Sequence, residues 1–305
     1  MSWFIRVPSS TSNLGAGFDS IGLALNLYLE LAVAKSDKWE FIPTSSCLEG
    51  IPSGKDNLVY EIVERVAERY DRINDLTPCR VEMKSDIPLA RGLGSSATAI
   101  IAGIELANLL LNLDLEQDEK LEIATEIEGH PDNVAPSLLG GCVIGHYDGE
   151  VAYTQIPVKG VTFVAIIPNF ELKTKDARAV LPNSFSFKES VQASSVANVS
   201  VAAICQGNWR LLGEMMKKDH FHQPYRKSLI PHYDDLLHYL NESALGVFLS
   251  GAGPTMIAIV DDKNVFTALK KWRSEFPEFE WLSLQVENGG SYVETRKESM
   301  IRHDG

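Results

Sequence analysis

The sequence has few features of secreted, membrane or disulfide-stabilised proteins. Its 305 residues include only four cysteines, which are widely spaced and form no CxxC pair. We therefore expect reduced, mostly buried thiols rather than a disulfide framework or a zinc ribbon. No apolar run reaches the ~18 residues of a membrane span, and the first residues lack the apolar stretch of a signal peptide. These absences predict a cytoplasmic protein with no membrane partner.

Positive charge is also scarce. The chain has 28 Lys and Arg against 41 Asp and Glu, a formal net charge of −13, and no block of five basic residues. This balance argues against a nucleic-acid partner, because such binding depends on basic patches. An acidic chain that binds phosphate must instead use local hydrogen-bond donors, such as the start of a helix.

The composition is that of a folded globular chain, with 45% hydrophobic and 23% charged residues. Its length exceeds that of one typical domain, so we predict two, at 1–165 and 166–305. Apolar periodicity predicts helices at 58–70, 97–111, 115–127, 191–216, 229–240 and 265–276, and strands at 21–33, 79–84, 161–168, 246–260 and 280–286. Helices and strands mix without regular βαβ alternation, which favours an α+β fold over a doubly wound parallel sheet.

The segment Gly92–Thr98 lies between a predicted strand and a predicted buried helix. Its glycines allow close approach of the backbone to a ligand, and free N–H groups at a helix start attract anions. Three interpretations stay open at this point: a serine-capped turn, a dinucleotide loop of the G-x-G-x-x-A type, and a nucleotide phosphate loop. It is not a Walker A loop, because no G-K-[ST] follows the glycines.

The glycine loop belongs to a longer pattern along the chain. Pro88–Ala97, which includes most of the loop, resembles the nucleotide loop of the GHMP small-molecule kinases. Val7–Leu25 is similar to the first motif of that family, and Gly251–Thr255 is similar to its glycine-rich third motif. Glu128–Pro136 resembles the same region of members that phosphorylate homoserine. The motifs occur in order over most of the chain. The resemblance implies a ribosomal-S5-like N-terminal domain and a ferredoxin-like C-terminal domain.

The resemblance also implies a reaction. ATP would donate its γ-phosphoryl group to the hydroxyl of L-homoserine, giving O-phospho-L-homoserine and ADP, a step in threonine biosynthesis. The phosphates of ATP would lie on the residues Pro88, Leu89, Ala90, Arg91, Gly92, Leu93, Gly94, Ser95, Ser96, Ala97 and Thr98. Mg²⁺ would be held by Ser96 and by one carboxylate of the next helix, since this ion prefers oxygen ligands. Glu126 is the favoured candidate, with Glu122 and Glu128 as alternatives.

By similarity, the substrate-binding residues are Asn13, Asp19, His130, Thr174, Arg178 and Arg226. A carboxylate suits the ammonium group of an amino acid, and arginines suit its carboxylate. Asn133 would orient the reacting hydroxyl, and Asp19 is the alternative as a catalytic base. The His130-x-Asp132 spacing alone does not indicate zinc, because no second His or Cys accompanies it. A homodimer is a family expectation only.

Two other functions fit the same motifs. The first is a GHMP kinase for a different alcohol, such as mevalonate or a sugar. The second is a nucleotide or metabolite sensor that has this fold but no catalytic activity. The two arginines and the His-Pro-Asp-Asn segment favour an amino-acid substrate over the first, and Ser96, a helix Glu and Arg178 argue against the second.

Overall fold

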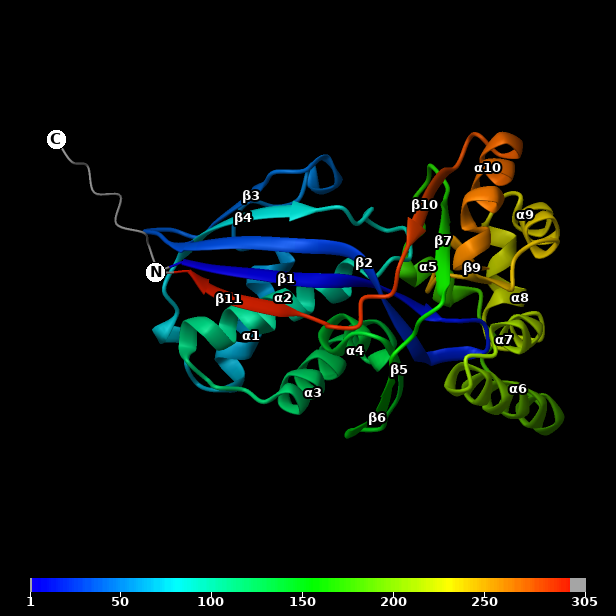
Figure 1. Cartoon of the computed structure of the whole chain (residues 1–305). Helices are drawn as coiled ribbons and strands as arrows, with labels where there is room; N and C mark the ends of the chain where they lie inside the picture. The colour runs from blue at the N-terminus through cyan, green and yellow to red at the C-terminus, as the bar shows by residue number, and fades with distance from the viewer. Residues whose placement is uncertain (1, 297–305) are drawn as a thin grey trace.

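The computed structural model describes residues 2–296, which form two α+β domains side by side (Figure 1). The strands are β1 (Ser2–Asn13), β2 (Gly17–Lys35), β3 (Glu40–Pro43), β4 (Cys79–Ser85), β5 (Cys142–Tyr147), β6 (Val151–Ile156), β7 (Val161–Ile167), β8 (Gly246–Leu249), β9 (Met256–Asp261), β10 (Glu280–Leu284) and β11 (Tyr292–Arg296). The helices are α1 (Leu58–Arg69), α2 (Ser95–Leu111), α3 (Gln117–Glu128), α4 (Pro131–Leu139), α5 (Thr174–Ala179), α6 (Phe187–Cys205), α7 (Trp209–Met216), α8 (Gln223–Arg226), α9 (Tyr233–Asn241) and α10 (Val265–Glu275). The predicted α+β class is confirmed.

The first sheet has seven strands built around the long strand β2. The order is β11-β1-β2-β4-β3, and β5 and β6 extend from the early part of β2. Residues Ile21–Leu23 of β2 pair with β5, whereas Leu29–Lys35 pair with β4. Helices α1 to α4 lie on one side of this sheet (Figure 1), and α2 packs against β1, α1 and α4. The long strands therefore connect the far end of this domain with the junction between the domains.

The second sheet is antiparallel, with the order β10-β7-β9-β8. Across the sheet, therefore, the fourth strand of this domain lies beside the first, then come the third and the second. Along the chain, helices separate the first strand from the second and the third from the fourth, as in the βαββαβ arrangement of a ferredoxin-like domain. Val164 and Ile166 of β7 pack with α9 and α10, whereas Phe163 and Ala165 pack with α6 and α7. Both faces are covered, which explains why the whole of β7 is buried and apolar.

The division between the domains does not follow the chain as simply as a cut at residue 165. That point lies inside β7, all of which belongs to the second sheet. The last strand, β11, returns to the first sheet and pairs with β1, as Figure 1 shows beside the N-terminus. We therefore propose that the first domain consists of about residues 2–160 together with β11. The second domain is then the part of the chain from β7 to β10.

Local sequence signals explain several boundaries, and some elements differ from the prediction. Asn57 caps α1 through a hydrogen bond from the Val59 N–H (3.0 Å). The predicted helix 191–216 is two helices, because Gly207 has a φ of +64° and Asn208 caps α7. Helix α4 was not predicted, and it begins with Pro131 in its first turn. Among the described residues, no helix is long and apolar enough to cross a membrane.

Candidate active site

The glycine-rich loop before α2 packs tightly between other backbone segments. Gly92 and Gly94 have φ values of +77° and +71°, which favour glycine. A Cβ at Gly94 would lie 2.2 Å from Ser10 Oγ, and one at Gly92 would lie 2.4 Å from the carbonyl oxygen of Ser250. Glycine is therefore required here both by the dihedral angles and by the space available.

Helix α2 begins at Ser95, and its N-cap is Gly94, which has no capping side chain. The serine-capped turn is therefore not what the structure shows, since Ser95 and Ser96 occupy the first helical turn. The N–H groups of such a turn have no acceptor within the helix, and the helix dipole is positive there. The start of α2 therefore offers backbone donors beside two hydroxyls, an arrangement that suits an anion.

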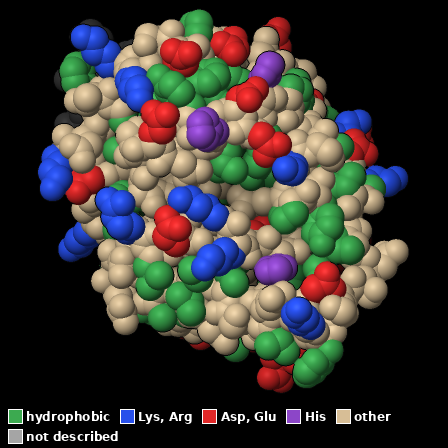
Figure 2. Space-filling model, turned by 90° about the vertical axis from the view of Figure 1, so that its right-hand side faces the viewer, with side chains coloured by type: hydrophobic (Ala, Val, Ile, Leu, Met, Phe, Trp, Pro, Cys, Tyr) green, Lys and Arg blue, Asp and Glu red, His purple; other side chains and the backbone are tan. Residues whose placement is uncertain are grey.

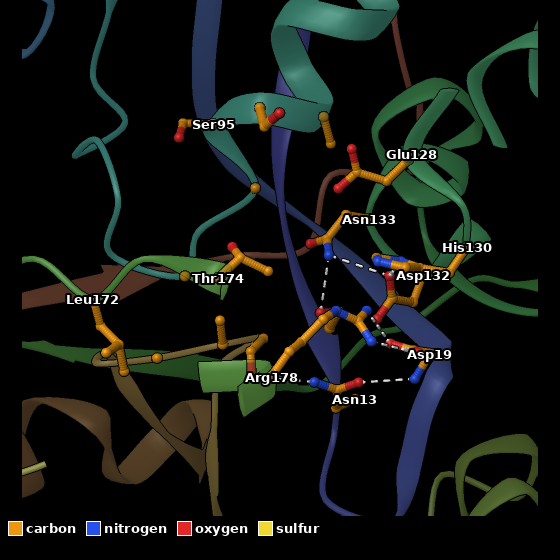
Figure 3. A pocket seen from close by; sticks show the side chains of 18 of the residues that line it. Asn13, Asp19, Ser95, Glu128, His130, Asp132, Asn133, Leu172, Thr174 and Arg178 are labelled. Carbon is orange, nitrogen blue, oxygen red and sulfur yellow. Dashed lines mark hydrogen bonds and ion pairs between the residues drawn. The ribbon is translucent and has the colours of Figure 1, made fainter. Parts of the chain in front are cut away.

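The start of α2 forms one wall of a pocket at the junction of the two domains (Figure 3). Six of the eleven predicted ATP-binding residues line it: Ala90, Gly92, Gly94, Ser95, Ser96 and Ala97. Leu93 and Thr98 are buried beside it. Pro88 and Arg91 line a different hollow, where Arg91 is 3.6 Å from Glu171, and Leu89 lines a neighbouring apolar pocket.

The apolar pocket adjoins the first one, because Ser95 and Ser96 line both. Its walls come from β2, β4, the start of α1 and the segment before it, and they are mainly aliphatic: Leu29, Leu48, Ile51, Pro52, Leu58, Val59, Met83 and Leu89. Asn57 also lines it. The start of α2 thus separates an apolar pocket from a polar one.

The polar pocket contains every residue predicted to bind the amino acid. They come from four places in the chain: the β1–β2 turn, α4, α5 and α8, and they are Asn13, Asp19, His130, Asn133, Thr174, Arg178 and Arg226. Figure 3 shows several of these side chains converging below the start of α2. On the surface seen in Figure 2, cationic and anionic side chains surround a hollow and are interspersed, so the chain's net negative charge does not dominate there.

Asp19 and Arg178 form an ion pair across the domain junction. The two guanidinium nitrogens Nη1 and Nη2 donate to the two carboxylate oxygens over 3.1 and 2.9 Å. Asp19 has a φ of +54°, and its N–H donates to Asn13 Oδ1 over 3.0 Å. Asn13 in turn donates to the carbonyl oxygen of Gly251 over 3.2 Å. The turn therefore fixes Asp19 from its backbone, while its carboxylate faces Arg178.

Arg226 is almost completely buried, with 2% of its surface exposed. Its Nε donates to the Ala177 carbonyl oxygen (3.0 Å) and its Nη1 to that of Gly251 (2.9 Å). Burial, and then the nearby charge of Arg178, lower the pKa of Arg226 to about 10. A buried guanidinium held by neutral carbonyls is electrostatically incomplete, so an anionic ligand would stabilise it.

Asn133 is held in place by three hydrogen bonds. Its Nδ2 donates to Ser12 Oγ (3.0 Å) and to Asp132 Oδ1 (3.2 Å), and its Oδ1 accepts from Ser10 Oγ (3.1 Å).

The Nδ1 of His130 lies 2.5 Å from Asp132 Oδ1. Burial disfavours the charged imidazole, but the hydrogen bond and charge of Asp132 outweigh it and raise the pKa of His130. The raised pKa favours the protonated imidazole, whose ring nitrogens both donate hydrogen bonds.

The structure does not support Glu126 as the carboxylate near the phosphates. Its Oε2 lies 2.5 Å from Arg69 Nη1, and more than half of its side chain is exposed. Glu128, two residues later on α3, lines the pocket, and Figure 3 shows it beside Asn133. Burial is the main reason that the pKa of Glu128 is raised. On a helix, a shift of two positions turns a side chain by more than half a turn, so only one of the two can face the site.

Ligand atoms of Asp19, His130 and Asp132 lie within 4.8 Å of one another. Both oxygens of Asp19 already accept from Arg178, and Oδ1 of Asp132 contacts His130 and Asn133. These three side chains are therefore partners of neighbouring residues, and we assign no metal to them.

Sequence reasoning missed some pocket residues. Phe18, Ser12 and Leu172 line it, as do Gly251, Ala252 and Gly253 of the predicted third motif. The signal for Phe18 was its place beside Asp19 in the first motif. The third motif had been recognised without a role, and its Gly251 carbonyl oxygen accepts from both Asn13 and Arg226.

Comparison with known proteins agrees with this geometry. The family models for the GHMP kinases N terminal domain and the GHMP kinases C terminal match residues 57–141 and 200–278. Homoserine kinase of Halalkalibacterium halodurans is 48% identical over 292 residues, covering 95% of this chain and 94% of the relative.

Two solved structures extend the likeness. A Listeria monocytogenes protein assigned as a homoserine kinase is 40% identical, with a TM-score of 0.82 over 96% of this chain and 100% of its own. Homoserine kinase of Cytophaga hutchinsonii is 28% identical, with a TM-score of 0.83 over 96% and 97% of the two chains. The chain therefore belongs to the homoserine kinases of the GHMP kinase family.

Proposed function

We propose that this protein catalyses the ATP-dependent phosphorylation of the L-homoserine hydroxyl, giving O-phospho-L-homoserine and ADP. The observation that carries the proposal is the junction pocket. It places the start of α2, which suits phosphates, opposite Asp19, Arg178 and Arg226, which suit a zwitterionic amino acid. The family relatives support the same substrate class.

The phosphates of ATP are proposed to lie against the backbone N–H groups at the start of α2. The adjoining apolar pocket then suits the adenine base, because its aliphatic walls can cover a flat ring. Ser95 and Ser96 stand where the two pockets meet. This arrangement explains how a chain of net charge −13 binds a polyanion without a basic loop.

The side chains of Ser96 and Glu128 fit Mg²⁺, because both line the junction pocket and both offer the oxygen ligands that this ion prefers. We propose that these two residues hold the ion that accompanies ATP. When bound, Mg²⁺ neutralises phosphate charge during transfer. Burial raises the pKa of Glu128, and a nearby cation would favour its ionised form.

For the amino acid, Asp19 is proposed to bind the ammonium group, and Arg178 and Arg226 the carboxylate. Asp19 and Arg178 are paired with each other in this structure. A zwitterion can replace that pair without leaving either charge unpaired, because it brings one partner for each. His130 and Thr174 complete the pocket walls.

Phosphoryl transfer depends mainly on positioning and electrostatic stabilisation, so it does not require a strong base. Asn133 has an amide, which is not basic, and its hydrogen bonds to Ser10, Ser12 and Asp132 fix its orientation. We propose that Asn133 orients the attacking hydroxyl, which loses its proton late. Asp19 is the alternative base.

A coupled ADP-release assay tests the function directly. Mg-ATP is supplied with homoserine, mevalonate, galactose or no acceptor, and the phosphorylated product is identified by phosphorus NMR. We expect ADP release well above the background only with homoserine, together with an equal amount of phosphate monoester. Turnover of mevalonate or galactose alone would reject the substrate assignment, and ATP binding without turnover of any alcohol would favour a sensor.

A further inference from the structure

Both arginines of the proposed carboxylate site contact one aromatic ring. The guanidinium carbon of Arg178 lies 5.6 Å from the ring centroid of Phe18, and that of Arg226 lies 5.2 Å from it. Phe18 lies in the N-terminal domain next to Asp19, whereas the arginines belong to α5 and α8 of the other domain. The ring itself lines the pocket.

Two rings of the second domain lie nearly parallel to the ring of Phe18. His222 lies 5.6 Å away, with 23° between the ring planes, and Phe221 lies 6.4 Å away with 20°. His222 is fully buried, and its Nε2 lies 2.8 Å from the carbonyl oxygen of Gly15, so this nitrogen is the donor. Its Nδ1, then an acceptor, is 3.4 Å from Arg226 Nη1. Phe18 thus packs against the residue that also contacts Arg226.

Two guanidinium groups near one another repel, and the nearby charge of Asp19 offsets this in part, since it favours the charged form of both arginines. Asp19 forms an ion pair with Arg178, whereas the hydrogen bonds of Arg226 within the described residues go to carbonyl oxygens and His222. The face of an aromatic ring carries negative potential and attracts cations within about 6 Å. Phe18 satisfies that distance for both arginines, and unlike a carboxylate it does not compete with the ligand for their N–H groups.

From this geometry we propose that Phe18 is a positioning residue, whose ring holds the guanidinium groups of Arg178 and Arg226 in place for the carboxylate of an α-amino acid substrate. The inference rests on the proposed function, and it adds a residue that acts through the two arginines. It predicts that the aromatic face, and not only the volume of the side chain, determines affinity for the carboxylate.

The test compares Phe18→Leu, Phe18→Met and Phe18→Tyr with the wild type and with Phe221→Leu. Loss of a ~1.4 kcal/mol interaction corresponds to tenfold in affinity. We therefore expect Leu and Met to raise KM for homoserine about tenfold, with kcat within about twofold and KM for ATP unchanged. Tyr should restore most of the affinity, because it keeps the aromatic face. Phe221→Leu removes a ring from the same cluster, and within residues 2–296 no Lys or Arg lies over that ring.

A substrate analogue separates the carboxylate effect from general packing. 3-Aminopropan-1-ol is homoserine without its carboxylate, so it does not use the two arginines. The preference for homoserine over this analogue, as a ratio of kcat/KM values, should fall about tenfold in Phe18→Leu and stay unchanged in Phe221→Leu. Thermal unfolding of each variant identifies one that fails to fold, and Phe18→Met, whose flexible side chain fills irregular gaps, then replaces Phe18→Leu.

Several outcomes would overturn the inference. An unchanged KM for homoserine in both Phe18→Leu and Phe18→Met would do so, as would an equal rise in Phe221→Leu or no rescue by Tyr. If the wild type fails to phosphorylate homoserine, the proposed function is rejected together with this inference. Wild-type turnover combined with unchanged constants in the variants rejects the inference alone.

Discussion

Glu128 and Glu126 provide a matched pair of substitutions on one helix. Each is replaced by Gln, which keeps the size and removes the charge. We propose that Glu128 binds the metal ion with Ser96, whereas Glu126 contacts Arg69 outside the pocket. The two variants should therefore fail in different ways, one in catalysis and the other in stability.

The expected size of each effect follows from the surroundings. Removing a group that stabilises charge in phosphoryl transfer costs roughly 10²–10³ in kcat, so Glu128→Gln should lose at least about 100-fold and need more Mg²⁺ for half-maximal rate. Burial raises the pKa of Glu128, so its ionised form destabilises the folded state at pH 7. Its Gln variant should unfold at the same or a higher temperature. Glu126→Gln breaks a largely exposed ion pair, which is worth about 0.2–1 kcal/mol, and should keep full activity.

The assay is ADP release at saturating homoserine over a range of Mg²⁺ concentrations, with thermal unfolding of the same samples. The decisive quantity is the ratio of kcat between the two variants. If Glu126→Gln lost activity as severely as Glu128→Gln, or if Glu128→Gln were fully active, the assignment of Glu128 to the metal would be rejected. If Glu128→Gln lost activity because it unfolds, its melting curve would show this. That result would contradict the expectation that this variant unfolds at the same or a higher temperature.

Three further predictions concern other residues. Asn133→Ala should lower kcat for homoserine at least tenfold with a smaller change in KM, whereas Asp19→Asn should mainly raise KM; a loss mainly in kcat for Asp19→Asn would indicate the base instead. Gly94→Ala should lower the free energy of unfolding by at least about 1–2 kcal/mol, since φ is positive and a Cβ there would collide with a serine hydroxyl; an unchanged denaturation midpoint would contradict this. Burial lowers the pKa of His222, so the unfolded chain binds a proton that the folded protein does not, and stability should fall as pH drops below the unfolded value of about 6.5. His222→Gln should lose less stability over that pH range; equal slopes would refute the reasoning.

Local patterns in the sequence predicted much of the fold. Helix α1, the alternating strand β4 and the apolar helix α2 follow from short-range periodicity, which depends on neighbouring residues only. Strand β11 was not predicted, because its mostly exposed residues carry no apolar pattern. It is a strand only because it pairs with β1, far away in the sequence.

The candidate site shows the same distinction. The ordered motifs identified the family, and they predicted the phosphate loop and most of the residues that meet in the junction pocket, because each motif keeps its chemistry within a few positions. They did not determine which glutamate of α3 faces the pocket, since three candidate glutamates lie along this helix and the packing of α3 against α2 and α4 decides which way each one points. Nor did they reveal that Phe18 meets arginines about 160 and 208 residues away. Contacts across the domain junction depend on how the two sheets are placed, and that placement exists only in the folded molecule.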